Sequence, residues 1–318
     1  MAPWLHCTLA MRWALVAICA CAPPHLRQTL PPIAPTTGPP QGRWPSLEPA
    51  GRTGAAPIDP YAADDLPLRE VTDDHVLSDV VLGDPGAVTT MVVRVDTGDY
   101  ALPTGPNHVV EREGALRRVT IRRIPGGPVT DRERADALRA ADRFDLATAA
   151  IRRTARVATS GARTDRARVA ALVTWIHTNI TYVLSDETVA SRVLARGSGD
   201  CSEMSMLFIA LARASNLPAR RVVGLAATEA DGASAFGFHA WAEVALDGHW
   251  VSVDPTWDEP VADATHVAIL VGDSDDWTRA IPGLRLAVVD LTRDASLAGR
   301  AGARQLVSEL PEYMRLTR

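Results

Sequence analysis

Apolar and polar positions alternate differently along the chain, and the patterns predict a strand-rich part followed by a helical part. In residues 65–128, short runs rich in β-branched residues are separated by glycines, which is typical of short strands joined by turns. These runs are residues 88–95, 108–111 and 115–124. After Pro128 the apolar spacing becomes helical, over 131–142 and again over 165–180. We therefore expect a small β-rich subdomain at 65–128 before a second domain at 131–318.

A further amphipathic pattern begins at Cys201. Apolar residues follow the i, i+3, i+4, i+7 spacing of one helix face at Met204, Leu207, Phe208 and Leu211. Asn216 tolerates the left-handed conformation and Pro218 cannot continue a helix, so the helix is expected to end there. Cys201 then lies at the first turn, where unpaired backbone N–H groups and the helix dipole favour a thiolate over a thiol.

Two strand-like runs downstream, residues 238–246 and 249–254, are separated by Asp247-Gly248, a strong signal for a two-residue hairpin. A two-residue turn fixes the register of the pair. Side-chain alternation then places four residues on one face of the hairpin: His239, Trp241, Asp254 and Thr256. His239 and Asp254 become diagonal neighbours within hydrogen-bonding reach. If Cys201 faces them, the three residues predict a nucleophile, its base and an orienting carboxylate.

The segments that carry these residues resemble the transglutaminase-like superfamily of papain-related cysteine enzymes, especially its bacterial members. The resemblance rests on GDCSEMSMLFIALARASNLPARRVVG, then HAWAEV, then WVSVDPTW, within a core of about residues 145–275. It implies an α+β fold in which a catalytic helix packs on an antiparallel sheet. It also implies that Cys201 is the nucleophile, His239 the base and Asp254 the orienting acid. The upstream side chain that shares the oxyanion hole in relatives is not placed by the sequence.

The implied activity is thiol-dependent acyl transfer on peptide or side-chain amides through a thioester at Cys201. Transfer to water makes the enzyme a protease or amidase, and transfer to an amine makes it a protein-glutamine transamidase. The triad does not separate the two, and we favour hydrolysis of a protein or peptide substrate such as a cell-wall peptide. No metal or organic cofactor is implied. The alternative is a non-catalytic, membrane-tethered protein-binding module on the same fold, which the loss of a triad member would indicate; none is missing.

Plainer interpretations exist for each of these residues. A lone cysteine is usually a small buried hydrophobe, and one Cys with one His lacks the paired ligand spacing of a zinc site. Trp241 is either a wall of the active site or a packing residue. Glu203 suits the positive end of the helix dipole. His177 and His249 are expected on the surface, and His266 is assigned no role.

The first 21 residues have the pattern of an export segment, with Arg12 before a short apolar run at 13–20. The tetrapeptide ICAC resembles a bacterial lipobox, which implies that Cys21 is lipidated. Residues 22–64 are rich in proline and predict a disordered tether. We therefore expect an exported, periplasmic or cell-surface protein that contacts the membrane through a lipid anchor. A misassigned start codon or a disordered tail is the alternative.

Composition narrows the choice of partners and chemistry. The chain of 318 residues has a formal net charge of -5, which argues against nucleic acid as a partner. All 33 basic residues are Arg, so a lysine of this chain cannot act as a Schiff-base or general-base residue. The oligomeric state is not indicated.

Overall fold

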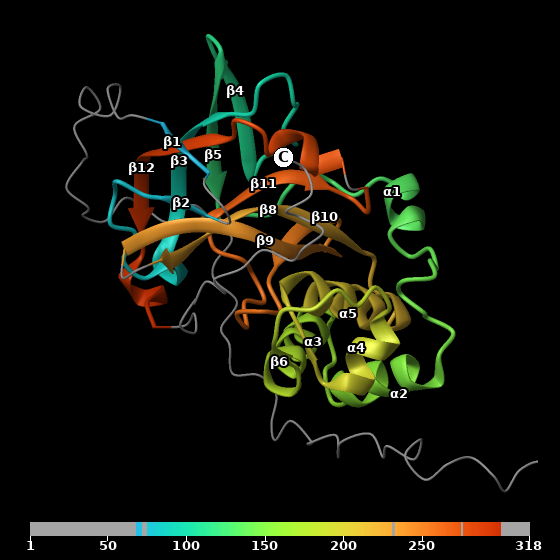
Figure 1. The fold of residues 1–318 in the computed structure, drawn as a ribbon. Coiled ribbons are helices and arrows are strands. Elements are labelled where there is room, and N and C mark those ends of the chain that lie inside the picture. Colours follow the sequence, from blue (N-terminus) through green and yellow to red (C-terminus); the bar gives the residue numbers. More distant parts are fainter. Residues whose placement is uncertain (1–67, 72–74, 231–232, 275, 300–318) are drawn as a thin grey trace, which may run out of the picture. The chain divides into compact units, whose positions relative to one another are not determined.

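The computed structural model describes residues 68–71, 75–230, 233–274 and 276–299. Antiparallel sheets and helices make up this part of the chain, so the predicted α+β class is confirmed (Figure 1). The predicted export segment, its Cys21 and the tether lie outside the described residues. Within the described residues, none of the helices combines the length and the apolar character that crossing a membrane requires.

The first sheet contains the three strand-like runs predicted before residue 128. Its strands, in spatial order, are β1 (Arg69–Glu70), β12 (Arg285–Arg293), β3 (Val88–Asp96), β5 (Leu116–Arg122) and β4 (His108–Glu113). β12 comes from much later in the sequence and pairs with β3 along its length. The boundary near residue 128 between two domains stays a prediction.

The second sheet carries the predicted hairpin. Its strands are β10 (His249–Val253), β9 (Ala233–Leu246), β8 (Ala219–Ala230) and β11 (His266–Val271), with β2 (His75–Leu77) paired to the first part of β9. The predicted hairpin register is confirmed, because Leu246 pairs with His249 and both turn residues, Asp247 and Gly248, have positive φ. β10 reaches only Ala242 of β9, and β2 reaches only Gly237. Residues 238–241 of β9 therefore lie in a gap between two partner strands.

Helices cover one side of the second sheet (Figure 1). They are α2 (Ala149–Ala158), α3 (Asp165–Asn179), α4 (Ala190–Arg196) and α5 (Cys201–Ala214). α5 packs on β9 and β8, and its apolar residues share a core with Ala242 and Val244 of β9. The predicted apolar face of α3 is buried in the same core. One end of α5 is thereby fixed against the gap in the sheet.

Short elements complete the described part. They are α1 (Asp131–Asp136), the parallel pair β6 (Thr181–Tyr182) and β7 (Ser198–Gly199), and the 3-10 turns η3 (Pro85–Ala87), η4 (Asp276–Ala280) and η5 (Ala295–Leu297). α1 is shorter than the predicted helix over 131–142. The carbonyl of Ala137 accepts a hydrogen bond from Ala219 at the start of β8, which takes it out of a longer helix.

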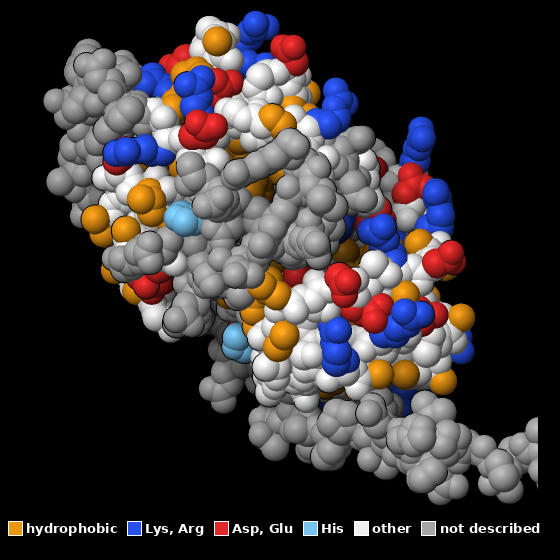
Figure 2. Space-filling model, viewed as in Figure 1, with side chains coloured by type: hydrophobic (Ala, Val, Ile, Leu, Met, Phe, Trp, Pro, Cys, Tyr) orange, Lys and Arg blue, Asp and Glu red, His pale blue; other side chains and the backbone are white. Residues whose placement is uncertain are grey.

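On the face shown in Figure 2, basic and acidic side chains lie interspersed on the described surface. Such mixing favours solubility over attraction to one highly charged partner.

Candidate active site

The N-terminus of α5 is capped by side chains that do not use the backbone amide of Cys201. Oδ1 of Asp200 accepts hydrogen bonds from the amides of Ser202 (2.8 Å) and Glu203 (3.3 Å). The Glu203 carboxylate accepts in return from the Asp200 amide (2.8 Å), which completes a capping box. Glu203 therefore has the helix-end role that its position suggested. The cap uses the first-turn amides of Ser202 and Glu203 but not that of Cys201.

His239 lies in the gap of β9 and connects Cys201 to Asp254. Its Nε2 is 2.7 Å from Oδ2 of Asp254, and the Cys201 thiol lies close enough to the same ring to raise its pKa. Because Nε2 is bound to Asp254, the thiol faces Nδ1. Asp254 is held in turn by the Thr256 amide, which donates to Oδ1 at 2.8 Å. The three residues predicted as a triad are thus brought together in sequence Cys, His, Asp.

The charges of this group reinforce one another. Burial alone would lower the pKa of His239, but the charge of Asp254, its hydrogen bond and the Cys201 thiol raise it to about 9. Burial would likewise raise the pKa of Asp254, yet the positive charge and hydrogen bond of His239 hold it far below its usual value. The protonated form of the His239 imidazole is therefore favoured beside the thiol.

Tyr182 is a further polar group at the thiol, and no pattern in the sequence indicated it. β6 pairs with β7, which places Tyr182 beside Gly199, two residues before Cys201. Its hydroxyl lies beside the thiol and the backbone amide of Cys201, and both groups act on its pKa. Burial of the hydroxyl, followed by the charges of Cys201 and Asp200, raises the pKa of Tyr182 well above its usual value. The residue as a whole is 40% exposed, so its hydroxyl is the enclosed end of a ring that faces solvent.

Comparison with known proteins finds a family match over part of the chain. The model of the transglutaminase-like superfamily matches residues 152–255, which include Cys201, His239 and Asp254. Residues 152–255 are therefore similar to the transglutaminase-like superfamily. The resemblance seen in the sequence is thereby confirmed over about a third of the chain. No curated protein matches the chain.

Several solved structures are similar to this chain. A cysteine protease candidate of Cytophaga hutchinsonii is 18% identical with a TM-score of 0.38, over 68% of this chain and 82% of that one. The periplasmic domain of TgpA from Pseudomonas aeruginosa is 15% identical with a TM-score of 0.41, over 64% of this chain and 93% of that domain. Red sea bream transglutaminase is 9% identical with a TM-score of 0.30, over 60% of this chain and 48% of that enzyme.

Two tryptophans flank the imidazole of His239. Trp257 stacks on His239 with ring centroids 4.0 Å apart and planes 9° from parallel. Trp241 lies nearly parallel to the same ring at 6.1 Å and is 2% exposed. Trp241 therefore packs beside the predicted base from inside the protein, and its role as an active-site wall stays a prediction. No pattern in the sequence indicated a role for Trp257, which follows Thr256 after the hairpin.

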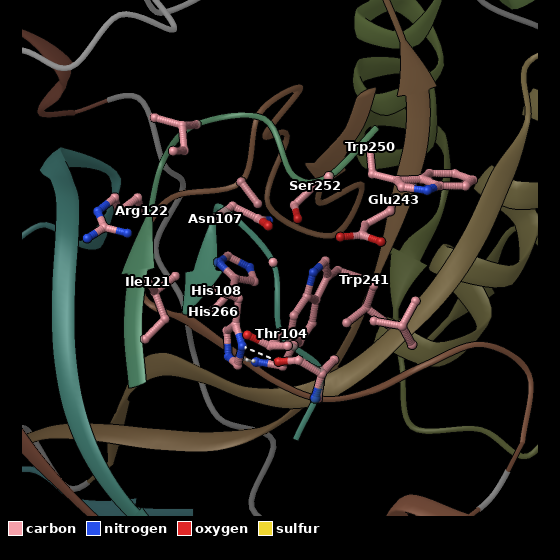
Figure 3. Close-up of a pocket in the computed structure, with 18 of the residues that line it drawn as sticks. Thr104, Asn107, His108, Ile121, Arg122, Trp241, Glu243, Trp250, Ser252 and His266 are labelled. Atoms are coloured by element: carbon pink, nitrogen blue, oxygen red, sulfur yellow. Dashed lines mark hydrogen bonds between the residues drawn. The ribbon is translucent and has the colours of Figure 1, made fainter. Parts of the chain in front are cut away.

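A cavity of about 320 Å³ lies on the face of the second sheet that carries Trp241 (Figure 3). His108 and His266 both line it, and Trp241 stands between them and Glu243. The hydrogen-bond partners of His108 suit a neutral imidazole. Its Nδ1 donates to the carbonyl of Pro103 at 2.8 Å, and its Nε2 accepts from the Ala268 amide at 3.1 Å. Burial lowers its pKa to about 4.

Two buried groups contain residue types that bind metal ions, with ligand atoms within 4.8 Å of one another. They are His239, Asp254 and His266, and Glu259, Asp263 and His266. In the first group both imidazoles are hydrogen-bonded to Asp254, at 2.7 and 3.1 Å. We therefore assign the first group to a proton-sharing network and not to a metal site.

The other histidines singled out in the sequence lie apart from this network. His249 is exposed at the hairpin turn, as expected. His177 is exposed on α3, and its Nδ1 donates to the Thr256 carbonyl at 2.9 Å. This hydrogen bond ties α3 to the segment that follows Asp254.

Proposed function

We propose that the protein is a thiol-dependent acyl-transfer enzyme that acts on peptide or side-chain amides. The observation that carries the proposal is that Cys201, at the N-terminus of a buried helix, lies beside the His239 ring, which is hydrogen-bonded to Asp254. A thiol paired with an imidazole that a carboxylate orients is the arrangement required for nucleophilic catalysis at neutral pH. The family match over residues 152–255 supports the same reaction class.

Acylation proceeds in two steps. Cys201 gives its proton to Nδ1 of His239, and the thiolate attacks the amide carbonyl to form a C–S bond and an oxyanion. The Cys201 backbone N–H, which the helix cap leaves over, donates to that oxyanion. His239 then returns the proton to the departing nitrogen, the C–N bond breaks, and a thioester remains on Cys201.

Deacylation reverses the roles of the same groups. His239 removes a proton from the acceptor, and the acceptor attacks the thioester carbonyl. The C–S bond breaks, sulfur leaves as the thiolate, and the proton stays on the imidazole. Asp254 keeps Nε2 protonated throughout, so Nδ1 alone exchanges protons with the reactants.

Tyr182 is our candidate for the second oxyanion donor. Its hydroxyl contacts both the thiol and the backbone amide of Cys201, the two groups that the substrate carbonyl must also approach. When the carbonyl takes the place of the hydroxyl at the amide, the hydroxyl is positioned to donate its own proton to the oxyanion. The raised pKa of Tyr182 keeps that proton in place at neutral pH.

We propose hydrolysis, with peptides such as those of a cell wall as substrates, and transamidation as the second outcome of the test. The protein is incubated with an extracellular peptide pool and a small primary amine, and the products are read by mass spectrometry. New peptide termini indicate hydrolysis, whereas amine adducts on Gln indicate transamidation. Cys201→Ala is expected to abolish either product, and His249→Gln, a change at the exposed hairpin turn, is expected to leave both unchanged.

A result against the enzyme is equally specific. If Cys201→Ala retains full biological activity and the wild type forms no product with any peptide, the domain is a binding module. Export and lipidation at Cys21 complete the proposal, since a cell-wall substrate lies outside the cytoplasm.

A further inference from the structure

His266 is a buried histidine whose two ring nitrogens both face acceptors. Nε2 lies 3.1 Å from Oδ2 of Asp254, the oxygen that also accepts from His239. Nδ1 lies 3.2 Å from the carbonyl oxygen of Asp263 and 3.3 Å from its Oδ1. That Oδ1 already accepts from the amide and the hydroxyl of Thr265, at 2.8 and 2.6 Å. A backbone carbonyl cannot donate a proton, and a neutral imidazole would leave one lone pair directed at an acceptor.

His108 is a buried histidine of the same protein with a different set of hydrogen-bond partners. Both rings are buried and line the same cavity (Figure 3). His108 faces one acceptor and one donor, which suits a neutral ring, whereas His266 faces acceptors on both sides. The hydrogen-bonding pattern therefore requires protons on both nitrogens of His266, which makes it an imidazolium.

The surroundings of His266 supply the opposite charge. Carboxylates face it from two segments: Asp254 after β10, and Glu259 and Asp263 before β11. His239 approaches from β9, with ring centroids 5.9 Å apart, and His108 lines the same cavity. The carboxylates, together with their hydrogen bonds, outweigh burial and raise the pKa of His266 to about 9.

Aromatic rings enclose the remaining sides of His266. Trp241 meets it at 5.0 Å and Trp257 at 5.6 Å, both at steep angles. These are the two tryptophans that flank His239. Trp241 and Trp257 thus contact both imidazole rings, His239 on one side of Asp254 and His266 on the other.

We propose that His266 is a positioning residue for the acyl transfer: a buried imidazolium that holds Asp254 between two imidazole rings and sets the pH range over which His239 exchanges a proton with Cys201. This inference deepens the proposed function and rests on it. Because Asp254 is shared, its negative charge is only partly available to His239. The positive charge of His266 also repels a second proton on its neighbour. Both effects let His239 release its proton to a leaving amine more readily than a simple His-Asp pair would.

The test removes the charge and retains a donor. In His266→Gln the side-chain amide can still donate to Asp254, but the positive charge is gone. Two charges about 6 Å apart at an effective dielectric constant near 20 change a pKa by about two pH units. The alkaline limb of the kcat/KM profile, which reports the loss of the His239 proton, is therefore expected to move upward by roughly that amount. His249→Gln serves as the matched control and should leave the limb in place.

A second measurement tests the protonation state of His266 and does not depend on enzymatic activity. Nitrogen-15 NMR of the wild-type ring nitrogens reports their protonation directly, with His108 as an internal neutral reference. We expect both nitrogens of His266 to carry protons at pH 7.5 and the titration of His239 to move upward in His266→Gln. A neutral His266 at pH 7.5, or an unchanged His239 titration, overturns the proposal. Absence of any acyl transfer by the wild type would instead refute the proposed function, and the NMR result would still decide the state of His266 if the variant failed to fold.

Discussion

Asp254→Asn is the most informative single change at this site. The side chain keeps its shape, and its oxygen can still accept from the Thr256 amide. Its amide nitrogen, however, donates where the carboxylate accepted from His239. His239 must then present Nε2 as an acceptor and carry its only proton on Nδ1, toward Cys201. In that tautomer it cannot take the proton of the thiol.

The size of the effect follows from the electrostatics of His239. Its pKa of about 9, against an ordinary 6.5, corresponds to roughly 3 kcal/mol of stabilisation of the imidazolium. Without the charge of Asp254, burial lowers the pKa below 6.5, and the ring is neutral at pH 7.5. We therefore expect kcat/KM at pH 7.5 to fall by roughly 100-fold or more.

Iodoacetamide labelling followed by intact-mass analysis measures the thiol directly. Wild-type Cys201 should be alkylated faster than a model thiol at pH 7.5, and Asp254→Asn should remove this advantage. Asp247→Asn is the matched control, because it makes the same chemical change at the exposed turn of the same hairpin, where a positive φ suits Asn. Circular dichroism confirms that both variants are folded. If Asp254→Asn labels as fast as the wild type from pH 6 to 9, Asp254 does not control the tautomer.

Three further predictions concern the Tyr182 hydroxyl, the packing at Gly224 and the pH dependence of stability. Tyr182→Phe removes only the hydroxyl at Cys201 and should lower kcat about 10- to 100-fold at unchanged melting temperature; an unchanged kcat would exclude it as a donor. Gly224→Ala would place a Cβ 2.0 Å from the Val267 carbonyl oxygen, so denaturant titration should show a loss of about 2 to 4 kcal/mol of unfolding free energy. Because the folded pKa values of His239 and His266 are about 9, above the ordinary 6.5, their contribution to stability is complete below pH 6.5 and is lost as pH rises through 9. The melting temperature should fall over that window, and fall less in His266→Gln.

A further prediction concerns the N-terminus. In a bacterial host, lipidation at Cys21 would place the protein in the membrane fraction. Cys21→Ser should move it to the soluble fraction, as read by immunoblotting. Equal distribution of the two proteins would refute the lipid anchor.

Local patterns were enough to predict the parts of the site that lie within a short stretch of sequence. The Asp247-Gly248 turn fixes the hairpin register, and the register alone brings His239 near Asp254. The start of α5 could be read from its apolar spacing after Cys201. In each case the deciding interactions join residues fewer than 20 positions apart.

Tertiary packing decides the rest, and no periodicity in the sequence reports it. Tyr182 reaches Cys201 only because β6 pairs with β7 in parallel. His266 reaches Asp254 because β11 pairs with β8, on the other side of β9 from the hairpin. In the same way β12 joins the first sheet from residues 285–293, nearly 200 positions after β3. A strand pattern predicts that such segments pair, but not with which partner.

The buried network is better explained by proton transfer than by stability. The side chains of Asp254, Asp263 and His266 are almost fully removed from solvent, and each buried ion costs several kcal/mol before its partner compensates. Well-packed apolar residues could fill the same space with equal or greater stability. A general base that must also act as an acid works best with a pKa near the working pH. Asp254 alone would raise the pKa of His239 above that range. The imidazolium of His266, on the far side of the carboxylate, limits this rise in pKa. The position of His266 therefore makes physical sense only because Cys201 lies at the other end of the series.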